Sequence, residues 1–256
     1  YALRILKNIG LACEGITTPG GFGARARPQL AQATLDAVRD VFGAEIPHYF
    51  LDLRDRGDQS VAPRVELASG LDGPDPRCVV SILGCTNDWT GGWDCSEPAG
   101  ADRFITADLQ SGRMVEVISR GEPALMVCHW TGIYWNGREL GFGIFQEVVR
   151  RLNARFDNLI WMKLSEVARY WAAKELTRID RSPTALGFRA PFACPQFTLG
   201  LQGAAGTGLR LESSGRSEPL REVTSGGDLQ SGTWKRGRGG LTVCLDLPKG
   251  SSRLAL

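Results

Sequence analysis

The stretch Ala-Leu-Met-Val-Cys-His-Trp (ALMVCHW, residues 124–130) decides the fold that the sequence predicts. Five apolar residues lead to His129, one of two histidines among 256 residues, and this run indicates a buried strand. A loop is expected next at residues 131–137, and it combines aromatic rings with amides that suit the faces and hydroxyls of a sugar. A helix-period segment follows at 141–152. This order is typical of a βα unit with its site at the carboxyl end of the strand.

The same stretch also has a purely structural interpretation. His129 would then cap a core strand through a hydrogen bond to the backbone, and Trp130 and Trp135 would serve as packing. The motif alone leaves both interpretations open, because a motif without its partner residues is only a hypothesis.

The composition is that of a soluble globular protein, with 43% hydrophobic and 23% charged residues and a net charge of +2. The one basic cluster, residues 235–238, is too short to indicate a nucleic-acid partner. No run of eighteen apolar residues predicts a membrane span, and no signal peptide is recognisable. Seven scattered cysteines without a CxxC pair favour a reducing compartment, so we expect a cytoplasmic location.

Residues 1–176 alternate strand-like runs with helix-period segments, which predicts repeated βα units. The expected strands are residues 15–18, 48–53, 78–83, 124–129 and 158–164. The expected helices are residues 1–9, 28–42, 112–119, 141–152 and 165–176. Because the helical pattern is already under way at Tyr1, we expect the natural protein to begin upstream, or a leader to have been removed.

The texture changes after residue 177 to short β-type runs between glycines and serines. Residues 177–191 are expected to be a linker. Residues 184–256 are expected to form a small, mainly antiparallel, sandwich-like accessory domain without catalytic groups. Its expected strands are residues 197–201, 209–212, 232–235, 241–247 and 253–256.

Three segments in order resemble the polysaccharide deacetylase-like branch of the glycoside hydrolase/deacetylase barrels. Residues 5–10 with 15–23 are similar to the family's third motif, and residues 124–129 to its late strand ending in a histidine. Residues 145–152 and 158–167 are similar to its closing helix, strand and helix. The resemblance covers about residues 1–175. It implies an α/β fold with a partial (β/α) barrel, and it assigns His129 as the general acid.

The chain departs from this family at its metal site. Family members carry an early aspartate pair and a histidine pair that hold a divalent metal, and nothing here matches either. His48 and His129 lie 81 residues apart on different predicted strands, with no third ligand implied. Thr17 and Thr18 stand where an arginine usually precedes the proline. A divalent metal is therefore implied by the resemblance alone, with its ligands expected upstream of this chain.

The candidate site residues follow the expected strand ends, which we predict to share one rim made of Thr18, Asp52, Leu83, His129 and Leu164. His129 and Asp52 are the candidate catalytic residues, because imidazole and carboxylate groups perform acid–base chemistry near neutral pH. Indole rings stack on sugars while carboxylates and turn amides bind hydroxyls. The candidate substrate-binding residues are Thr18, Gly20, Gly21, Asp88, Trp89, Trp93, Trp130 and Trp135.

We therefore expect a carbohydrate-active, deacetylase-like hydrolase that cleaves C–N or C–O acyl bonds of a saccharide. One alternative is a catalytically silent carbohydrate-binding or scaffold domain that kept the barrel. Another is a glycosidase that uses two carboxylates in the same barrel. The expected partner is a saccharide, with neither nucleic acid nor membrane, and the oligomeric state is left open.

Overall fold

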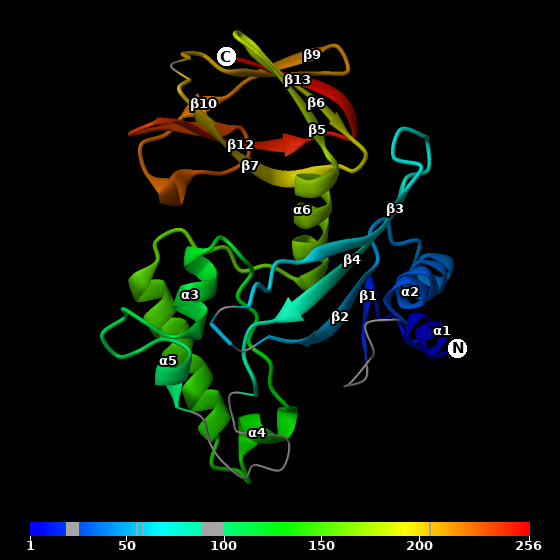
Figure 1. The fold of residues 1–256 in the computed structure, drawn as a ribbon, viewed down its shortest axis with the longest axis vertical. Coiled ribbons are helices and arrows are strands. Elements are labelled where there is room, and N and C mark those ends of the chain that lie inside the picture. Colours follow the sequence, from blue (N-terminus) through cyan, green and yellow to red (C-terminus); the bar gives the residue numbers. More distant parts are fainter. Residues whose placement is uncertain (19–25, 55, 58, 89–99, 205) are drawn as a thin grey trace.

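The computed structural model describes residues 1–18, 26–54, 56–57, 59–88, 100–204 and 206–256 (Figure 1). A four-stranded sheet with its helices forms the α/β part, and two further sheets form a β part above it in that view. The mixed α/β class is thus confirmed. None of the sheets that the described residues build is closed, so the partial barrel is not confirmed.

The sheet of the α/β part has the order β1-β2-β4-β3. Strands β1 (Gly15–Thr17), β2 (His48–Leu53) and β4 (Arg77–Gly84) run parallel, and β3 (Arg64–Ser69) pairs with β4 as an antiparallel hairpin. The seven residues of β4 after Arg77 are all buried. A strand buried on both faces reads as a continuous apolar run, which is why its position could be predicted.

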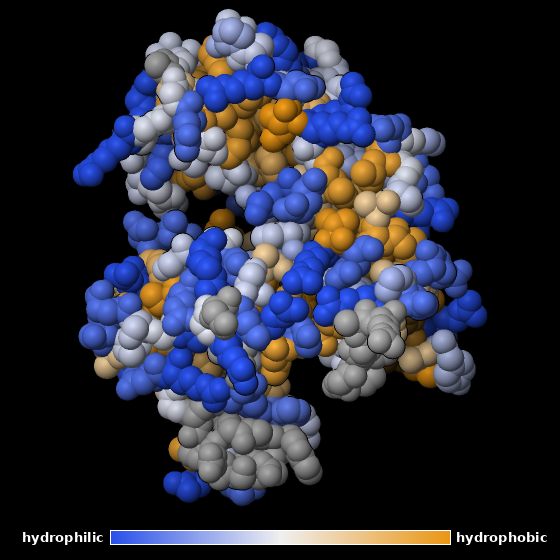
Figure 2. Space-filling view, in the orientation of Figure 1, coloured by the Kyte–Doolittle hydropathy of each residue, from blue (hydrophilic) through white to orange (hydrophobic). Residues whose placement is uncertain are grey.

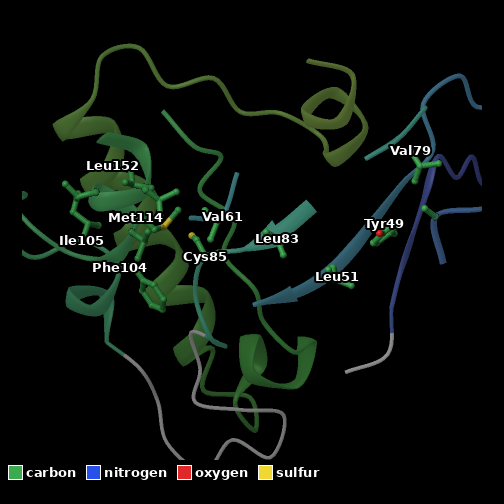
Figure 3. Packing of buried hydrophobic residues seen from close by; sticks show 14 of the residues in the cluster. Tyr49, Leu51, Val61, Val79, Leu83, Cys85, Phe104, Ile105, Met114 and Leu152 are labelled. Atoms are coloured by element: carbon green, nitrogen blue, oxygen red, sulfur yellow. The ribbon is translucent and has the colours of Figure 1, made fainter. Parts of the chain in front are cut away.

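Helices cover both faces of β4. Val79 and Leu83 pack with Leu35 of α2 (Arg27–Phe42), whereas Val80 and Ile82 pack with Trp171 of α6 (Leu164–Leu176). The first of these clusters continues past the end of β4 to Cys85, Phe104 and Met114 (Figure 3). The alternation follows from the two-residue period of a strand. The remaining helices of this part are α1 (Ala2–Asn8), α3 (Arg113–Ser119), α4 (Trp130–Tyr134), α5 (Leu140–Arg155) and the 3-10 turn Ala101–Arg103.

The β part is a pair of sheets with the orders β10-β11-β12-β7 and β5-β6-β13-β8-β9. Its strands pair antiparallel except for β10 with β11, and Trp234 lies fully buried in the core between them. Their bounds are β5 (Arg178–Ser182), β6 (Ala185–Ala190), β7 (Cys194–Gln202), β8 (Arg210–Ser213), β9 (Arg216–Pro219), β10 (Arg221–Glu222), β11 (Thr233–Gly237), β12 (Gly240–Leu247) and β13 (Gly250–Ala255), with a 3-10 turn at Gly226–Asp228.

Helix α6 joins the two parts. Trp171 belongs to the α/β core, while Ala173, two residues later, belongs to the core of the β part. The hydroxyl of Tyr170 donates a hydrogen bond to the carbonyl oxygen of Thr198 on β7 (3.3 Å). Apolar side chains are visible on the surface where the upper sheets meet the α/β part (Figure 2). None of the helices described is long and apolar enough to cross a membrane.

Four sequence expectations about secondary structure are wrong. Residues 124–129 and 159–163 lie outside every sheet, and the expected linker forms β5 and β6. Ile160 and Trp161 are exposed at 67% and 61%, so their apolar character does not reflect burial in a strand. The expected loop at 131–137 begins as the short helix α4.

Candidate functional site

The candidate site lies beyond the carboxyl end of β4, the edge where the parallel strands β1 and β2 also end. After β4, residues 85–88 run beside residues 125–129. The backbone N–H of Cys85 donates to the carbonyl oxygen of Leu125 (3.0 Å), and the N–H of Val127 donates to the hydroxyl of Thr86 (3.4 Å). A side chain thus takes the place of a backbone acceptor. The 124–129 segment is therefore extended without becoming a strand.

His129 and Asp88 form a pair at the end of this segment. The imidazole Nδ1 lies 2.7 Å from Oδ2 of Asp88, which also accepts the backbone N–H of His129 (3.0 Å). The Asp88 side chain is 10% exposed and the His129 side chain 56% exposed. An ionised carboxylate only accepts hydrogen bonds, so Nδ1 carries the proton and a neutral ring keeps a free lone pair on Nε2. Asp88 therefore fixes both the tautomer and the orientation of His129.

An aromatic pair follows His129 directly. Trp130 and Tyr134, one turn apart on α4, are 71% and 56% exposed. Their ring centroids are 6.5 Å apart at an angle of 70°, an edge-to-face contact. Figure 1 shows α4 below the sheet, past the carboxyl end of β4. Exposed rings beside an oriented imidazole can bind the apolar face of a ligand whose polar group reaches His129.

Arg113 at the start of α3 holds this edge together. Its side chain is 6% exposed, and it donates hydrogen bonds to the carbonyl oxygens of Cys85 (3.0 Å), Arg54 (2.6 Å) and Gln59 (3.0 Å). These carbonyls belong to the ends of β4 and β2 and to the loop after β2. Sequence reasoning missed Arg113, because an arginine at the beginning of a helix ordinarily indicates a solvated position.

Two thiols near the site are not activated nucleophiles. Burial raises the pKa of Cys85 to about 11 despite the opposing charge of Arg113. Burial and the neighbouring Asp88 carboxylate raise the pKa of Cys128 to about 11 as well. A thiolate is the reactive form of cysteine. Both side chains are therefore protonated at neutral pH, so neither of these two described cysteines provides a thiolate nucleophile beside His129.

The other predicted site residues are placed differently. Thr18 is buried, and its hydroxyl donates hydrogen bonds to the carbonyl oxygens of Leu51 (2.8 Å) and Phe50 (3.0 Å). Asp52 is exposed, and no described residue hydrogen-bonds its carboxylate. Trp135 is only 9% exposed, so it packs in the interior and offers no open face to a sugar. Gly20, Gly21, Trp89 and Trp93 lie outside the described residues.

The predicted rim is correct for its parallel strands and wrong at its last member. Thr18, Asp52 and Leu83 lie at or next to the carboxyl ends of β1, β2 and β4, and His129 lies beyond the end of β4. Leu164 ends no strand, because it is the first residue of α6.

The described residues do not fit a divalent-metal site. They contain no group of three His, Cys, Asp or Glu side chains able to hold a metal ion. His48, the other histidine, begins β2 at the opposite end of the parallel strands. It is 7% exposed, and its Nδ1 has no hydrogen-bond partner among the described residues. Burial lowers the pKa of His48, with Glu14 acting in the opposite direction.

No protein-family model, curated protein or solved structure matches the chain. The chemistry of His129, Asp88 and the adjacent aromatic pair is therefore the basis for assigning a function.

Proposed function

We propose that the protein is a carbohydrate-active hydrolase that cleaves an acyl C–N or C–O bond of a saccharide, with His129 as its proton-transfer residue. The observation that carries this proposal is the 2.7 Å hydrogen bond between Nδ1 of His129 and the Asp88 carboxylate, with the Asp88 side chain 10% exposed and the His129 side chain 56% exposed. We also propose that the chain is related to polysaccharide deacetylase-like domains and shares their partial barrel. The parallel strands that end at this edge support it.

The proposed chemistry uses His129 twice. Nε2 first accepts a proton from the water that attacks the acyl carbon, and then gives that proton to the leaving oxygen or nitrogen of the sugar. Asp88 stabilises the imidazolium that exists between these two steps, in the manner of the aspartate in a catalytic triad. No step is assigned to a metal, because the described residues do not provide its ligands.

Substrate binding is assigned to Trp130 and Tyr134. Both rings are exposed on α4, the helix that begins directly after His129, and indole and phenol faces stack against the C–H surface of a pyranose. The two-carboxylate glycosidase is less well supported, because Asp88 is hydrogen-bonded to His129, which supports a role for this carboxylate in orienting the imidazole. We also propose a cytoplasmic location, which six free thiols among the described cysteines support.

The test is acetate release from O-acetylated xylo-oligosaccharides and N-acetylated chito-oligosaccharides by the full chain. We expect turnover of one of these classes and a loss of about two to four decades in kcat for Asp88→Asn, which removes the negative charge that stabilises the imidazolium. Asp40→Asn is the matched control, because Asp40 is an exposed carboxylate paired only with Arg4 (3.0 Å). Absence of turnover by the unmodified chain, or equal activity of both variants, contradicts the proposal.

The second candidate is a carbohydrate-binding domain without catalysis, and the exposure of Trp130 and Tyr134 favours it specifically. In that case the chain binds the same oligosaccharides without releasing acetate. Trp130→Ala then abolishes binding, whereas Asp88→Asn leaves the affinity unchanged. Calorimetric titration with both variants separates the two candidates.

A further inference from the structure

A hollow lies where the α/β part meets the β part, and His129 is not among its lining residues. Its volume is about 410 Å³. The tip of the β3–β4 hairpin forms one side, and β5, β6 and the start of β13 form the other (Figure 1). Its walls include the apolar residues Leu71, Leu176 and Pro191. The volume lies within the range typical of small-molecule sites, which is about 300–1,000 Å³.

Three cationic side chains from different segments line this hollow: Arg178 on β5, Arg189 on β6, and Lys249 just before β13. In the sheet register Arg178 lies directly opposite Arg189, which lies directly opposite Ser251. Directly opposed residues of neighbouring strands share one face, and like charges in such a pair are destabilising. This row therefore has an arrangement that an anion would stabilise.

The acidic residues nearby compensate this charge only weakly. Arg178 lies 3.4 Å from Asp72, but both side chains are 62% exposed. Lys249 lies 3.8 Å from Glu45, also at the surface. Exposed ion pairs of this kind contribute little. Arg189 has no ion pair or side-chain hydrogen bond with any described residue. Residues 178–256 also contain eleven basic side chains and six acidic ones, so the surrounding field favours an anion.

We propose that this hollow binds the phosphate group of a small organic phosphate ester. The guanidinium groups of Arg178 and Arg189 match the geometry of phosphate oxygens, and Lys249 adds a third positive charge. The hydroxyl of Ser251 supplies a neutral donor in the same row. The organic body of the ester packs against Leu71, Leu176 and Pro191. The site is independent of the hydrolase proposed for His129.

The experiment titrates the full chain with inorganic phosphate, glucose 6-phosphate, glucuronate and glucose by calorimetry. We expect saturable binding that is strongest for glucose 6-phosphate, weaker for phosphate and glucuronate, and absent for glucose. Arg189→Gln should raise the Kd of glucose 6-phosphate about tenfold, because it removes charge-assisted hydrogen bonds. Arg216→Gln is the control, since Arg216 is an exposed arginine of the same sheet, on β9 and outside the hollow.

Two results would overturn the existence of the site. One is the absence of saturable binding of every anion by the unmodified chain. The other is an equal change in Kd for Arg189→Gln and Arg216→Gln, which would indicate attraction to the overall charge alone. Tighter binding of glucuronate than of glucose 6-phosphate would overturn the assignment to a phosphate ester. Because acetate release is not involved, failure here is distinguishable from failure of the proposed hydrolase.

Discussion

The two histidines of the chain lie at opposite ends of the parallel strands and in opposite environments. At the amino end, His48 begins β2 as a buried ring whose Nδ1 has no hydrogen-bond partner in the described part of the chain. Beyond the carboxyl end, His129 is half-exposed and its Nδ1 is hydrogen-bonded to Asp88 at 2.7 Å. Burial without a partner favours the neutral, inert ring. A carboxylate that is hydrogen-bonded to an exposed imidazole ring orients that ring for proton transfer.

The polar groups at these ends differ in the same way. The carboxyl end is held by Arg113, whose buried guanidinium binds the carbonyl oxygens of three chain segments. The amino end is held by close packing, with no room for a Cβ at Gly15 beside the ring of His48. Polar pairing fixes the edge proposed to be functional, and steric fit fixes the opposite one.

The largest expected effect separates the two histidines by activity. His129→Ala should lower kcat by about two to four decades and leave the fold intact, because a proton-transfer residue is lost. His48→Ala should leave kcat unchanged and affect stability at most. Steady-state kinetics of acetate release, with circular dichroism of both variants, checks this. Equal losses of activity in the two variants would show that the wrong end of the sheet has been chosen.

The second effect tests the polar pairing of the carboxyl end. Arg113→Met should lower the free energy of unfolding by about 3 kcal/mol, because it removes the buried guanidinium that donates to the carbonyl oxygens of Cys85 and Arg54. The matched control is Arg120→Met. Arg120 binds the carbonyls of Gly57 (2.8 Å) and Gln59 (3.2 Å) in the same loop, but it is 34% exposed. A loss of about 1 kcal/mol is expected there. Urea unfolding that ranks the two variants in the opposite order would refute this role of Arg113.

The third effect tests the steric fit of the amino end. A Cβ added at Gly15 would lie 2.3 Å from Nε2 of His48, so Gly15→Ala must displace a buried ring. We expect a loss of about 2 kcal/mol, as for other overpacked cores. In the double variant with His48→Ala the loss should be smaller than the sum of the single losses, because the clash is gone. Strict additivity would mean that the two residues do not interact.

The smallest effect is a pH dependence of stability from His48. Burial lowers its pKa below the ordinary value of 6.5, and Glu14 only partly opposes this. Above pH 6.5 the ring is neutral in the folded and unfolded chains. Below pH 6.5 the unfolded chain binds a proton that the folded chain excludes, so the free energy of unfolding decreases as the pH falls.

This dependence is measured by urea unfolding between neutral and mildly acidic pH. His48→Gln should reduce the slope, because glutamine does not titrate, whereas His129→Gln should reduce it less. A slope that is the same in His48→Gln as in the unmodified chain would contradict the burial argument.

The sequence predicts elements whose periodicity matches their burial. Strand β2 was predicted with the observed bounds, and α2 and α6 to within one residue, because their apolar residues recur at the spacing that the core requires. The segments 124–129 and 158–164 are equally apolar, yet neither joins a sheet. The first pairs mainly through side chains, and Trp161 in the second is exposed. Apolar composition alone does not reveal whether a neighbouring strand is there to receive a segment.

The sequence predicts His129 and Asp88 as separate site residues, but it does not predict that they contact each other. His129 and Asp88 were both candidates, but their contact spans 41 positions and depends on where the chain goes after β4. Asp52 was the expected catalytic carboxylate, and it stays exposed without a hydrogen bond to a described residue. Arg113 gave no signal, because only tertiary structure turns the beginning of a helix into a buried cation site. Long-range polar contacts of this kind have no period to detect.

The most direct test of the central claim is the tautomer of His129, observed by two-bond ¹H–¹⁵N correlation spectra of the imidazole rings. The chain has two histidines, so His48→Gln assigns the signals. At mildly alkaline pH we expect His129 to be protonated at Nδ1, with Nε2 free, and Asp88→Ala, which removes the acceptor, to shift it toward the Nε2-protonated form. A His129 already protonated at Nε2 in the unmodified chain, and unchanged by Asp88→Ala, would contradict the account.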